Sequence, residues 1–378
     1  MKFAATRTKP KSEPSINRPK PIDLDQVPEV EKLMEVLGKG NFLRDQVESR
    51  LGRNNIWVGP TNTGESVFVK RLLGDRPDVA KRVRRSLDMQ RVLADHPEGA
   101  DAAPALIGHD VDNGILVFEN LEEAQPAGDL MVEDRFDTEL AMRCGRLVGQ
   151  LHETEPTPEL DESRPLFPSE ELLVGVPVTM FDRLGNTELE AWRLLQQDPE
   201  LHEGVLRLLA AEDVAPKTPT HCDLRVDQFL LVGERLLITD WEEFRLADPA
   251  RDVGGFAGEW LYRAILDIVT SRGDAEFLDI DFTQEVVLTR GVEKFLRLRP
   301  LVETFWQGYL EVRGEVDPEI AERATAYAGW HMIDRLIAAA AQRPRLLGIE
   351  RAAAGIGRTA LLAPERFVKT LGLGPVDD

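Results

Sequence analysis

The stretch "HCDLRVDQFLLVGERLLITDWEEF", residues 221–244, constrains the fold more than any other part of this chain. Two short apolar runs, "QFLLV" and "RLLIT", are joined by Gly-Glu, a pattern that predicts a β-hairpin over 219–244. A hairpin returns its second strand beside its first. We therefore expect Asp223 and Asp240, at or next to its two ends, to lie close together in space.

Two neighbouring carboxylates repel each other unless a cation lies near them or their pKa values are shifted differently. A divalent cation bound by oxygen ligands meets this need. The alternative is a hairpin with incidental polar residues, since an Asp-Trp pair at a strand end is often part of a turn. The hairpin alone leaves both interpretations open.

Upstream of the hairpin, the sequence predicts a small mixed unit. A short helix between Val27 and Asp45 precedes two β-rich runs around the turn "PTNTGE". We expect a three-stranded antiparallel sheet here, with Lys70 near the end of the third strand. A helix follows, then two strands around "DNG". Beyond residue 125 the apolar residues recur mostly at helical spacing.

The expected fold class is therefore α+β, with two lobes. We expect a disordered basic tail over 1–22, a β-rich N-lobe over 23–121 and a mostly helical C-lobe over 122–378 that contains the hairpin.

Composition excludes several classes of protein. The net charge of −21 argues against binding to nucleic acid or anionic membranes. No apolar run is long enough to cross a membrane, and the N-terminus lacks the apolar segment of a secretory signal, so we expect a cytoplasmic protein. The two cysteines, Cys144 and Cys222, form neither a disulfide framework nor a zinc motif.

Together these features suggest phosphoryl transfer. Lys70 offers a cation for an anionic ligand, and the segment "GRNNIWVG", residues 52–59, joins two strands so that its backbone can approach phosphates. Asp240 would hold a metal with a neighbouring ligand, and Asp223 would act as a base near a hydroxyl. Each piece alone is weak evidence, because a lysine after a strand is commonly just solvated.

The hairpin resembles that of the aminoglycoside phosphotransferase and choline kinase-like family, which has a protein-kinase-like fold. The family pattern runs HGDLHPGN, strand, turn, strand, IDW and DPxxDLA, and "VFVKRL", "GILVFENL" and "CGRLVGQLHE" match further segments. The resemblance implies ATP and Mg²⁺ as cofactors. It makes Asp223 the catalytic base, Asp240 a metal ligand and Lys70 the lysine that contacts the α- and β-phosphates.

The resemblance also assigns supporting roles. His221 would support the loop, and Asp252 would be structural rather than catalytic. The expected nucleotide contacts come from the loop after the first strand and from the strand "VFENL": Gly52, Arg53, Asn54, Phe118, Glu119 and Leu121.

Three departures from the family pattern affect the site. Gln228 stands where the family has Asn as second metal ligand, and its carbonyl oxygen remains available although the side chain is longer. Arg225 and Asp227 replace His and Gly, which places a candidate catalytic arginine beside the acceptor. Either Asp88 or Gln90 occupies the place of the glutamate that pairs with the lysine.

The sequence says less about which molecule carries the acceptor hydroxyl than about the fold. The segment "LGRNNIWVGPTNTGESVFVKRL" is similar to kinase components of class V lanthipeptide and thioamitide biosynthesis, which implies phosphorylation of Ser/Thr in a precursor peptide and a separate lyase partner. The long stretch 157–215 and the basic tail also favour a peptide. The alternatives are a kinase for an aminoglycoside or another small molecule, and a catalytically impaired peptide-binding module.

Overall fold

The computed structural model describes residues 23–50, 54–94, 102–272 and 284–375. The chain divides into two compact units, the first made of Met1–Val83 and Ala105–Asn120, the second of Arg84–Pro104 and Leu121–Asp378. The second unit includes residues 84–104, which the sequence-based division places in the N-lobe. The reason is hydrophobic: the second half of helix α2 (Arg76–Ala94) buries Met89, Val92 and Leu93 in the core of the second unit.

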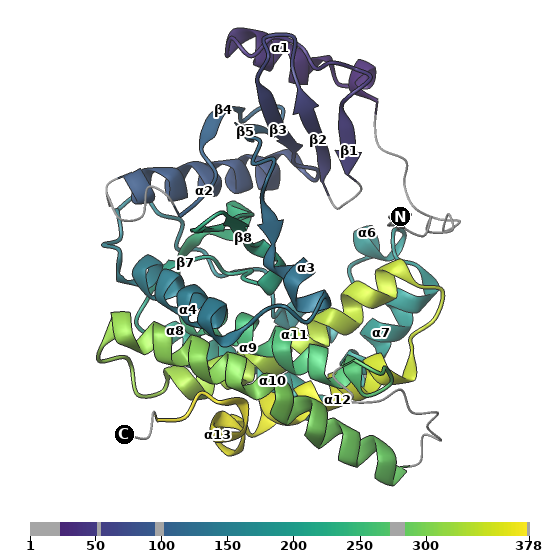
Figure 1. The fold of residues 1–378 in the computed structure, drawn as a ribbon. Coiled ribbons are helices and arrows are strands. Elements are labelled where there is room, and N and C mark those ends of the chain that lie inside the picture. Colours follow the sequence, from purple (N-terminus) through teal and green to yellow (C-terminus); the bar gives the residue numbers. More distant parts are fainter. Residues whose placement is uncertain (1–22, 51–53, 95–101, 273–283, 376–378) are drawn as a thin grey trace, which may run out of the picture. The chain divides into compact units, whose positions relative to one another are not determined.

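The first unit contains the predicted antiparallel sheet, in the strand order β1-β2-β3-β5-β4 (Figure 1). Gly114, with φ of 68°, lies in the predicted turn between β4 and β5, where a left-handed backbone favours glycine. The elements are η1 (Leu24–Gln26), α1 (Pro28–Val36), β1 (Glu48–Arg50), β2 (Asn55–Pro60), β3 (Ser66–Arg71), β4 (Leu106–Asp110) and β5 (Ile115–Glu119).

One face of this sheet packs against α1. Trp57, Val69 and Val117 lie opposite one another on neighbouring strands, and all three are buried in a cluster with residues of α1. Side chains alternate along a strand, so Lys70 and Phe118 project from the other face. The predicted position of Lys70, near the end of the third strand, is confirmed.

The second unit is mostly helical, as predicted. It includes α3 (Ala127–Val132), α4 (Thr138–Glu153), α5 (Glu170–Val174), α6 (Val178–Phe181), α7 (Asn186–Gln196), α8 (Pro199–Val214), α9 (Ala250–Asp267), α10 (Gln284–Arg313), α11 (Ile320–Gln342), α12 (Gly348–Leu362), η4 (Pro364–Arg366) and α13 (Val368–Leu371). Its strands and remaining 3₁₀ turns are β6 (Gln125–Pro126), β7 (Thr218–Thr220), η2 (Val226–Gln228), β8 (Phe229–Val232), β9 (Arg235–Ile238), η3 (Trp241–Glu243) and β10 (Arg245–Ala247).

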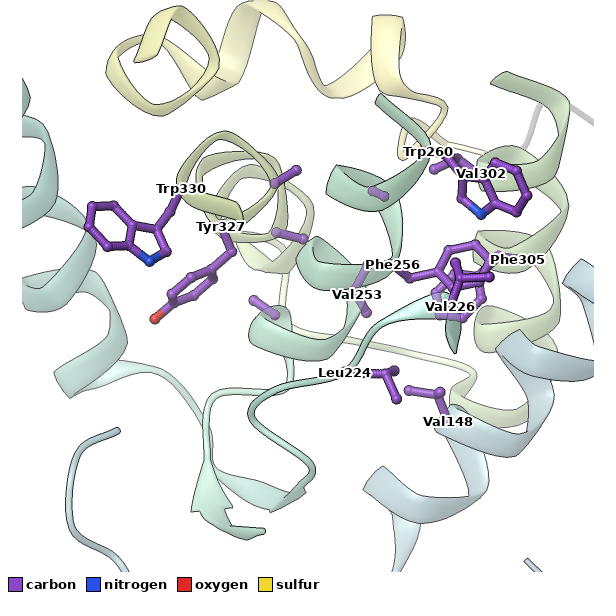
Figure 2. Packing of buried hydrophobic residues seen from close by; sticks show 14 of the residues in the cluster. Val148, Leu224, Val226, Val253, Phe256, Trp260, Val302, Phe305, Tyr327 and Trp330 are labelled. Carbon is purple, nitrogen blue, oxygen red and sulfur yellow. The ribbon is translucent and has the colours of Figure 1, made fainter. Parts of the chain in front are cut away.

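One large hydrophobic cluster joins these helices to the hairpin. Phe256 of α9 stacks on Phe305 of α10, with ring centroids 3.9 Å apart. Leu224 and Val226, from the loop before the hairpin, point into the same cluster (Figure 2). Burial of these side chains fixes the loop that carries Asp223 to the helical core.

A buried ion pair adds a polar contact between helices. Arg251 of α9 forms two hydrogen bonds to Glu212 of α8, at 2.5 and 2.8 Å, and its guanidinium lies 4.8 Å from the ring centre of Tyr327. Both charged side chains are almost fully enclosed. Among the residues that the structure describes, we find no helix with the length and hydrophobicity of a membrane span.

We expect Arg251→Met to lower the free energy of unfolding by roughly 3–5 kcal/mol, because it leaves the Glu212 carboxylate buried without its partner. Urea unfolding followed by circular dichroism measures the change. Arg366→Met, which removes an exposed arginine paired with Glu365, is the matched control and should cost about 0.5 kcal/mol or less. Equal losses in the two variants would contradict this account.

Candidate active site

The predicted hairpin is confirmed, and its pairing continues past the strand ends. Strands β8 and β9 pair antiparallel from Phe229↔Ile238 to Val232↔Arg235. The next pair outward is also linked, since the Gln228 carbonyl accepts a hydrogen bond from the Thr239 N–H at 3.0 Å. Asp240 therefore follows directly on a strand end that is fixed to the end of the 221–228 segment, which we call the Asp223 loop.

His221 ties the Asp223 loop to the strand end before Asp240. Its Nδ1 accepts a hydrogen bond from the Asp223 N–H at 3.3 Å, which leaves Nε2 to donate to the Thr239 carbonyl at 2.9 Å. The imidazole is fully buried and packs against Trp241. The loop-supporting role expected of His221 has these contacts as its physical basis.

A fully buried carboxylate anchors the start of the same loop. Asp252 accepts hydrogen bonds from the backbone N–H groups of His221 and Cys222, both at 2.8 Å, and from His152 Nε2 at 3.1 Å. His152 in turn lies 3.1 Å from the Tyr309 hydroxyl. Asp252 thus holds the loop backbone, in keeping with a structural role.

Two residues of the site have left-handed backbone conformations. Cys222 has φ of 67° and Asp240 has φ of 72°. Aspartate tolerates this region better than most residues, whereas glycine is the residue that adopts it freely. Cys222 stands where the family pattern HGD has glycine, the residue that adopts this backbone conformation freely.

Side chains of the Asp223 loop alternate between the core and the surface. Leu224 and Val226 are buried, whereas Asp223, Arg225 and Asp227 point away from the core. Arg225 Nη1 lies 3.3 and 3.5 Å from the two carboxylate oxygens of Asp223, and its Nε donates to Asp227 at 3.1 Å. The positive charge predicted beside Asp223 is thus held by two carboxylates.

The surroundings of Asp223 raise its pKa above the ordinary value. Nearby protein atoms displace water from the carboxylate, although 46% of the side-chain area is exposed. Arg225 and His221 oppose that shift, while the negative charges of Asp240 and Asp334 add to it. The hairpin has therefore brought Asp223 and Asp240 close enough to interact electrostatically.

The two expected metal ligands differ in what they can offer a cation. Asp240 is partly buried at the strand end and presents a carboxylate, the ligand that Mg²⁺ prefers. The Gln228 side chain is only 3% exposed, and its oxygen already accepts the Arg225 N–H at 2.8 Å. No cluster of three or more His, Cys, Asp or Glu that could bind a metal occurs among the described residues. Asp240 fits a magnesium ion whose other ligands come from phosphate and water, as Mg²⁺ sites in kinases commonly require.

The residues expected to contact a nucleotide have different surroundings. Asn54 is buried, and its side-chain oxygen accepts from the Leu73 N–H and from Arg82 of α2, at 3.2 and 3.3 Å. It therefore fixes the start of β2. Gly52 and Arg53 lie outside the described residues.

The segment around the end of β5 contains the remaining nucleotide candidates. Phe118 packs edge-to-face against Phe68, and the Glu119 carboxylate accepts the Ala105 N–H at 2.9 Å. Leu121 follows in the second unit, where its carbonyl accepts the Ala124 N–H. Backbone contacts from this segment to an adenine remain a prediction.

Both candidate partners of Lys70 have other contacts. Asp88 pairs with Arg91 at 2.9 Å, and the Gln90 amide donates to the Pro104 carbonyl at 3.1 Å. The pairing of Lys70 with Asp88 or Gln90 stays a prediction.

The sequence did not indicate a network of ion pairs at the end of η3. Arg85 of α2 binds Asp161 at 2.7 Å and Glu243 at 3.3 Å, and Glu243 also binds Arg245. Glu243 ends the short 3₁₀ helix η3, and Asp240 is the N-cap residue of that helix. The charges of these residues are visible in the sequence, but nothing in their spacing predicts that they meet.

Comparison with known proteins decides the family. A model of the phosphotransferase enzyme family matches residues 46–285, well over half of the chain. The chain belongs to this family. The family assignment makes the protein a phosphotransferase and confirms the broader part of the resemblance seen in the sequence.

Solved structures support the fold of the family. Choline kinase LicA from Streptococcus pneumoniae is 16% identical, with a TM-score of 0.52, and the match covers 90% of this chain and 100% of that protein. Amicoumacin kinase hAmiN, solved with AMP-PNP, Ca²⁺ and Ami, is 13% identical, with a TM-score of 0.52 and coverage of 90% and 96%. No curated protein sequence gave a significant match.

Strain at position 222 predicts an unusual order of stabilities. Cys222→Gly should be at least as stable as the wild type, because glycine adopts φ of 67° freely. Cys222→Val should lose about 1–2 kcal/mol, because a β-branched side chain is disfavoured in this region. Urea unfolding midpoints measure both changes, and a glycine variant less stable than the valine variant would contradict the assignment of strain.

The charges around Asp223 predict how its pKa changes when Arg225 is replaced. Arg225→Gln should raise the pKa of Asp223 further, because it removes a charge that favours the carboxylate while Asp240 and Asp334 remain. Arg225→Lys should keep the pKa near that of the wild type. Carbon-13 NMR of the aspartate carboxyls gives the pKa, with the signal assigned by its absence in Asp223→Asn; a fall in Arg225→Gln would show that the cation acts elsewhere.

Proposed function

We propose that this phosphotransferase moves the γ-phosphate of ATP to a hydroxyl group, with Asp223 as the base. The observation that carries the proposal is the fixed hairpin end, where His221 links the Asp223 N–H to the carbonyl of Thr239, next to Asp240. A base and a metal-binding carboxylate on one rigid support are the parts that phosphoryl transfer needs. The carboxylate of Asp223 would orient the acceptor hydroxyl and take its proton.

Nucleotide binding is proposed for the first unit together with Leu121, which follows it directly in the chain. Lys70 and Phe118 project from the same face of the sheet, opposite the face that packs on α1. Lys70 would contact the α- and β-phosphates, and Gly52, Arg53 and Asn54 would lie near the phosphates. The backbone of Phe118, Glu119 and Leu121 would contact the adenine. The binding of AMP-PNP by amicoumacin kinase, a protein of similar fold, supports ATP as the donor.

A magnesium ion bound to Asp240 would neutralise part of the phosphate charge. The carboxylate fits such an ion because the negative charge of Asp223 lies close to it, and a cation would offset the repulsion between the two groups. The chain itself supplies the positioning: the Asp240 backbone follows Thr239, which is hydrogen-bonded to both Gln228 and His221.

For the acceptor we propose a Ser or Thr of a precursor peptide, followed by elimination in a separate lyase. The long segment before the hairpin offers exposed apolar side chains that a peptide could contact: Leu166, Val174, Val178 and Phe181 are each more than half exposed. Arg225 beside Asp223 is also poorly suited to an acceptor rich in amines.

A small hydroxylated molecule is the second candidate acceptor. Choline kinase and amicoumacin kinase, two proteins of similar fold, support this alternative. A third candidate, a peptide-binding module without catalysis, rests on Gln228, whose oxygen is engaged by the backbone.

Asp223→Asn should lower phosphate transfer at least a thousandfold while AMP-PNP still binds, because the amide cannot take the proton. Mass spectrometry of Ser/Thr peptides, choline and aminoglycosides incubated with ATP and Mg²⁺ identifies the acceptor class. Asp112→Asn, at an exposed position in the turn between β4 and β5, is the control and should remain active.

The outcomes separate the candidates. Phosphopeptide formation supports the peptide acceptor, and phosphorylation of small molecules alone rejects it while leaving the kinase in place. ATP binding without any transfer would favour the binding module. Absence of nucleotide binding at millimolar ATP and Mg²⁺ would refute the kinase proposal.

A further inference from the structure

The side chain of Gln228 has a structural task that conflicts with metal binding. Its Oε1 accepts a hydrogen bond from the backbone N–H of Arg225 at 2.8 Å. Arg225 is the N-cap residue of the short 3₁₀ helix η2, so this bond caps the N-terminal end of that helix. Its Nε2 is enclosed by protein and makes no hydrogen bond with the described residues. The oxygen of Gln228 thus faces the backbone N–H of Arg225, and its NH₂ group is surrounded by protein atoms.

The reverse orientation of this amide is unfavourable. A rotation by 180° would place the NH₂ group against the Arg225 N–H, so that two donors would face each other. It would also leave that backbone N–H without an acceptor, at a cost typical of a buried unpaired donor. The oxygen of Gln228 is therefore committed to Arg225, and coordination of a cation would require this bond to be given up or shared.

Gln228 holds the backbone of Arg225, and the guanidinium charge of Arg225 acts on the carboxylates of Asp223 and Asp240. The Arg225 guanidinium contacts the Asp223 carboxylate at 3.3 Å, and its Nε bond to Asp227 restrains it from the other side. Asp240 is also close enough to interact with it electrostatically. Kinases with two magnesium ions place a second cation in this neighbourhood, held by the asparagine of the loop.

We propose that this site uses one divalent cation, bound at Asp240, and that the Arg225 guanidinium, positioned by Gln228, replaces the second cation beside Asp223. The inference rests on the proposed kinase function. In this arrangement Arg225 is a positioning residue: it balances the charge of Asp223 and leaves the phosphate chemistry to the ion at Asp240. Gln228 acts on the reaction only through Arg225.

The number of bound cations tests this proposal without an acceptor. Mn²⁺ is titrated into the full-length protein with saturating AMP-PNP, and the free ion is measured by electron paramagnetic resonance. We expect one Mn²⁺ per chain in the wild type and in Gln228→Met, with affinities within about threefold of each other. Gln228 is not a ligand, and the contacts of Arg225 with Asp223 and Asp227 keep the guanidinium charge in the site. Asp240→Asn should weaken binding at least tenfold, the scale of a lost charged ligand, and Asp112→Asn should not.

Variants at Arg225 test the second half of the proposal. Arg225→Met should bind Mn²⁺ about tenfold more tightly, or bind a second ion, because removal of a nearby positive charge leaves Asp223 and Asp240 less neutralised. Arg225→Lys should restore binding close to that of the wild type. An unchanged affinity in Arg225→Met would show that the guanidinium does not act as a cation in this site.

The remaining outcomes separate this inference from the proposed function. Two Mn²⁺ ions in the wild type, or a tenfold loss in a folded Gln228→Met, would make Gln228 a ligand and overturn the inference alone. If Gln228→Met does not fold, the wild-type stoichiometry still decides. Failure of AMP-PNP to bind would overturn the inference together with the kinase proposal.

Discussion

The geometry of the site depends on one buried carboxylate. Asp252 is fully enclosed and accepts hydrogen bonds from the backbone of His221 and Cys222 and from the ring of His152. A buried charge without such donors would be strongly unfavourable. The Asp252 carboxylate therefore needs the loop N–H groups beside it, and these bonds in turn hold the loop in place. Because the backbone before Asp223 is fixed in this way, the hairpin and His221 then fix Asp240 relative to it.

Local sequence pattern predicted the parts of this arrangement that depend on neighbouring residues. The hairpin followed from two apolar runs around Gly-Glu, and the strand of Lys70 from its β-rich run. The small strands β7 and β10 were not predicted, because three residues show no periodicity. The second half of α2 was placed with the N-lobe, since a helical pattern does not show which core its apolar side chains enter.

Contacts between distant residues were beyond prediction from the sequence. His152 and Asp252 are 100 positions apart, and only folding brings α4 and α9 together around them. For Gln228 the sequence identified the unusual residue and kept open the possibility that its oxygen coordinates a metal. Whether the amide oxygen reaches the Arg225 N–H or is free to bind a metal depends on the turn of η2, which residue type does not encode.

Electrostatics explains why a site of this kind needs fixed cations. The chain has a net charge of −21, and the negative charges of Asp240 and Asp334 act on Asp223. Distant surface charges are largely screened by salt, so a phosphate-bearing ligand responds mainly to groups within about 10 Å. An arginine at this distance contributes its charge at any metal concentration, whereas a weakly bound second ion would be lost when the metal is scarce. With the proposed replacement of a second ion by Arg225, the site would depend on the folded loop rather than on the metal supply. The bond of Gln228 to the Arg225 backbone fixes the start of this turn.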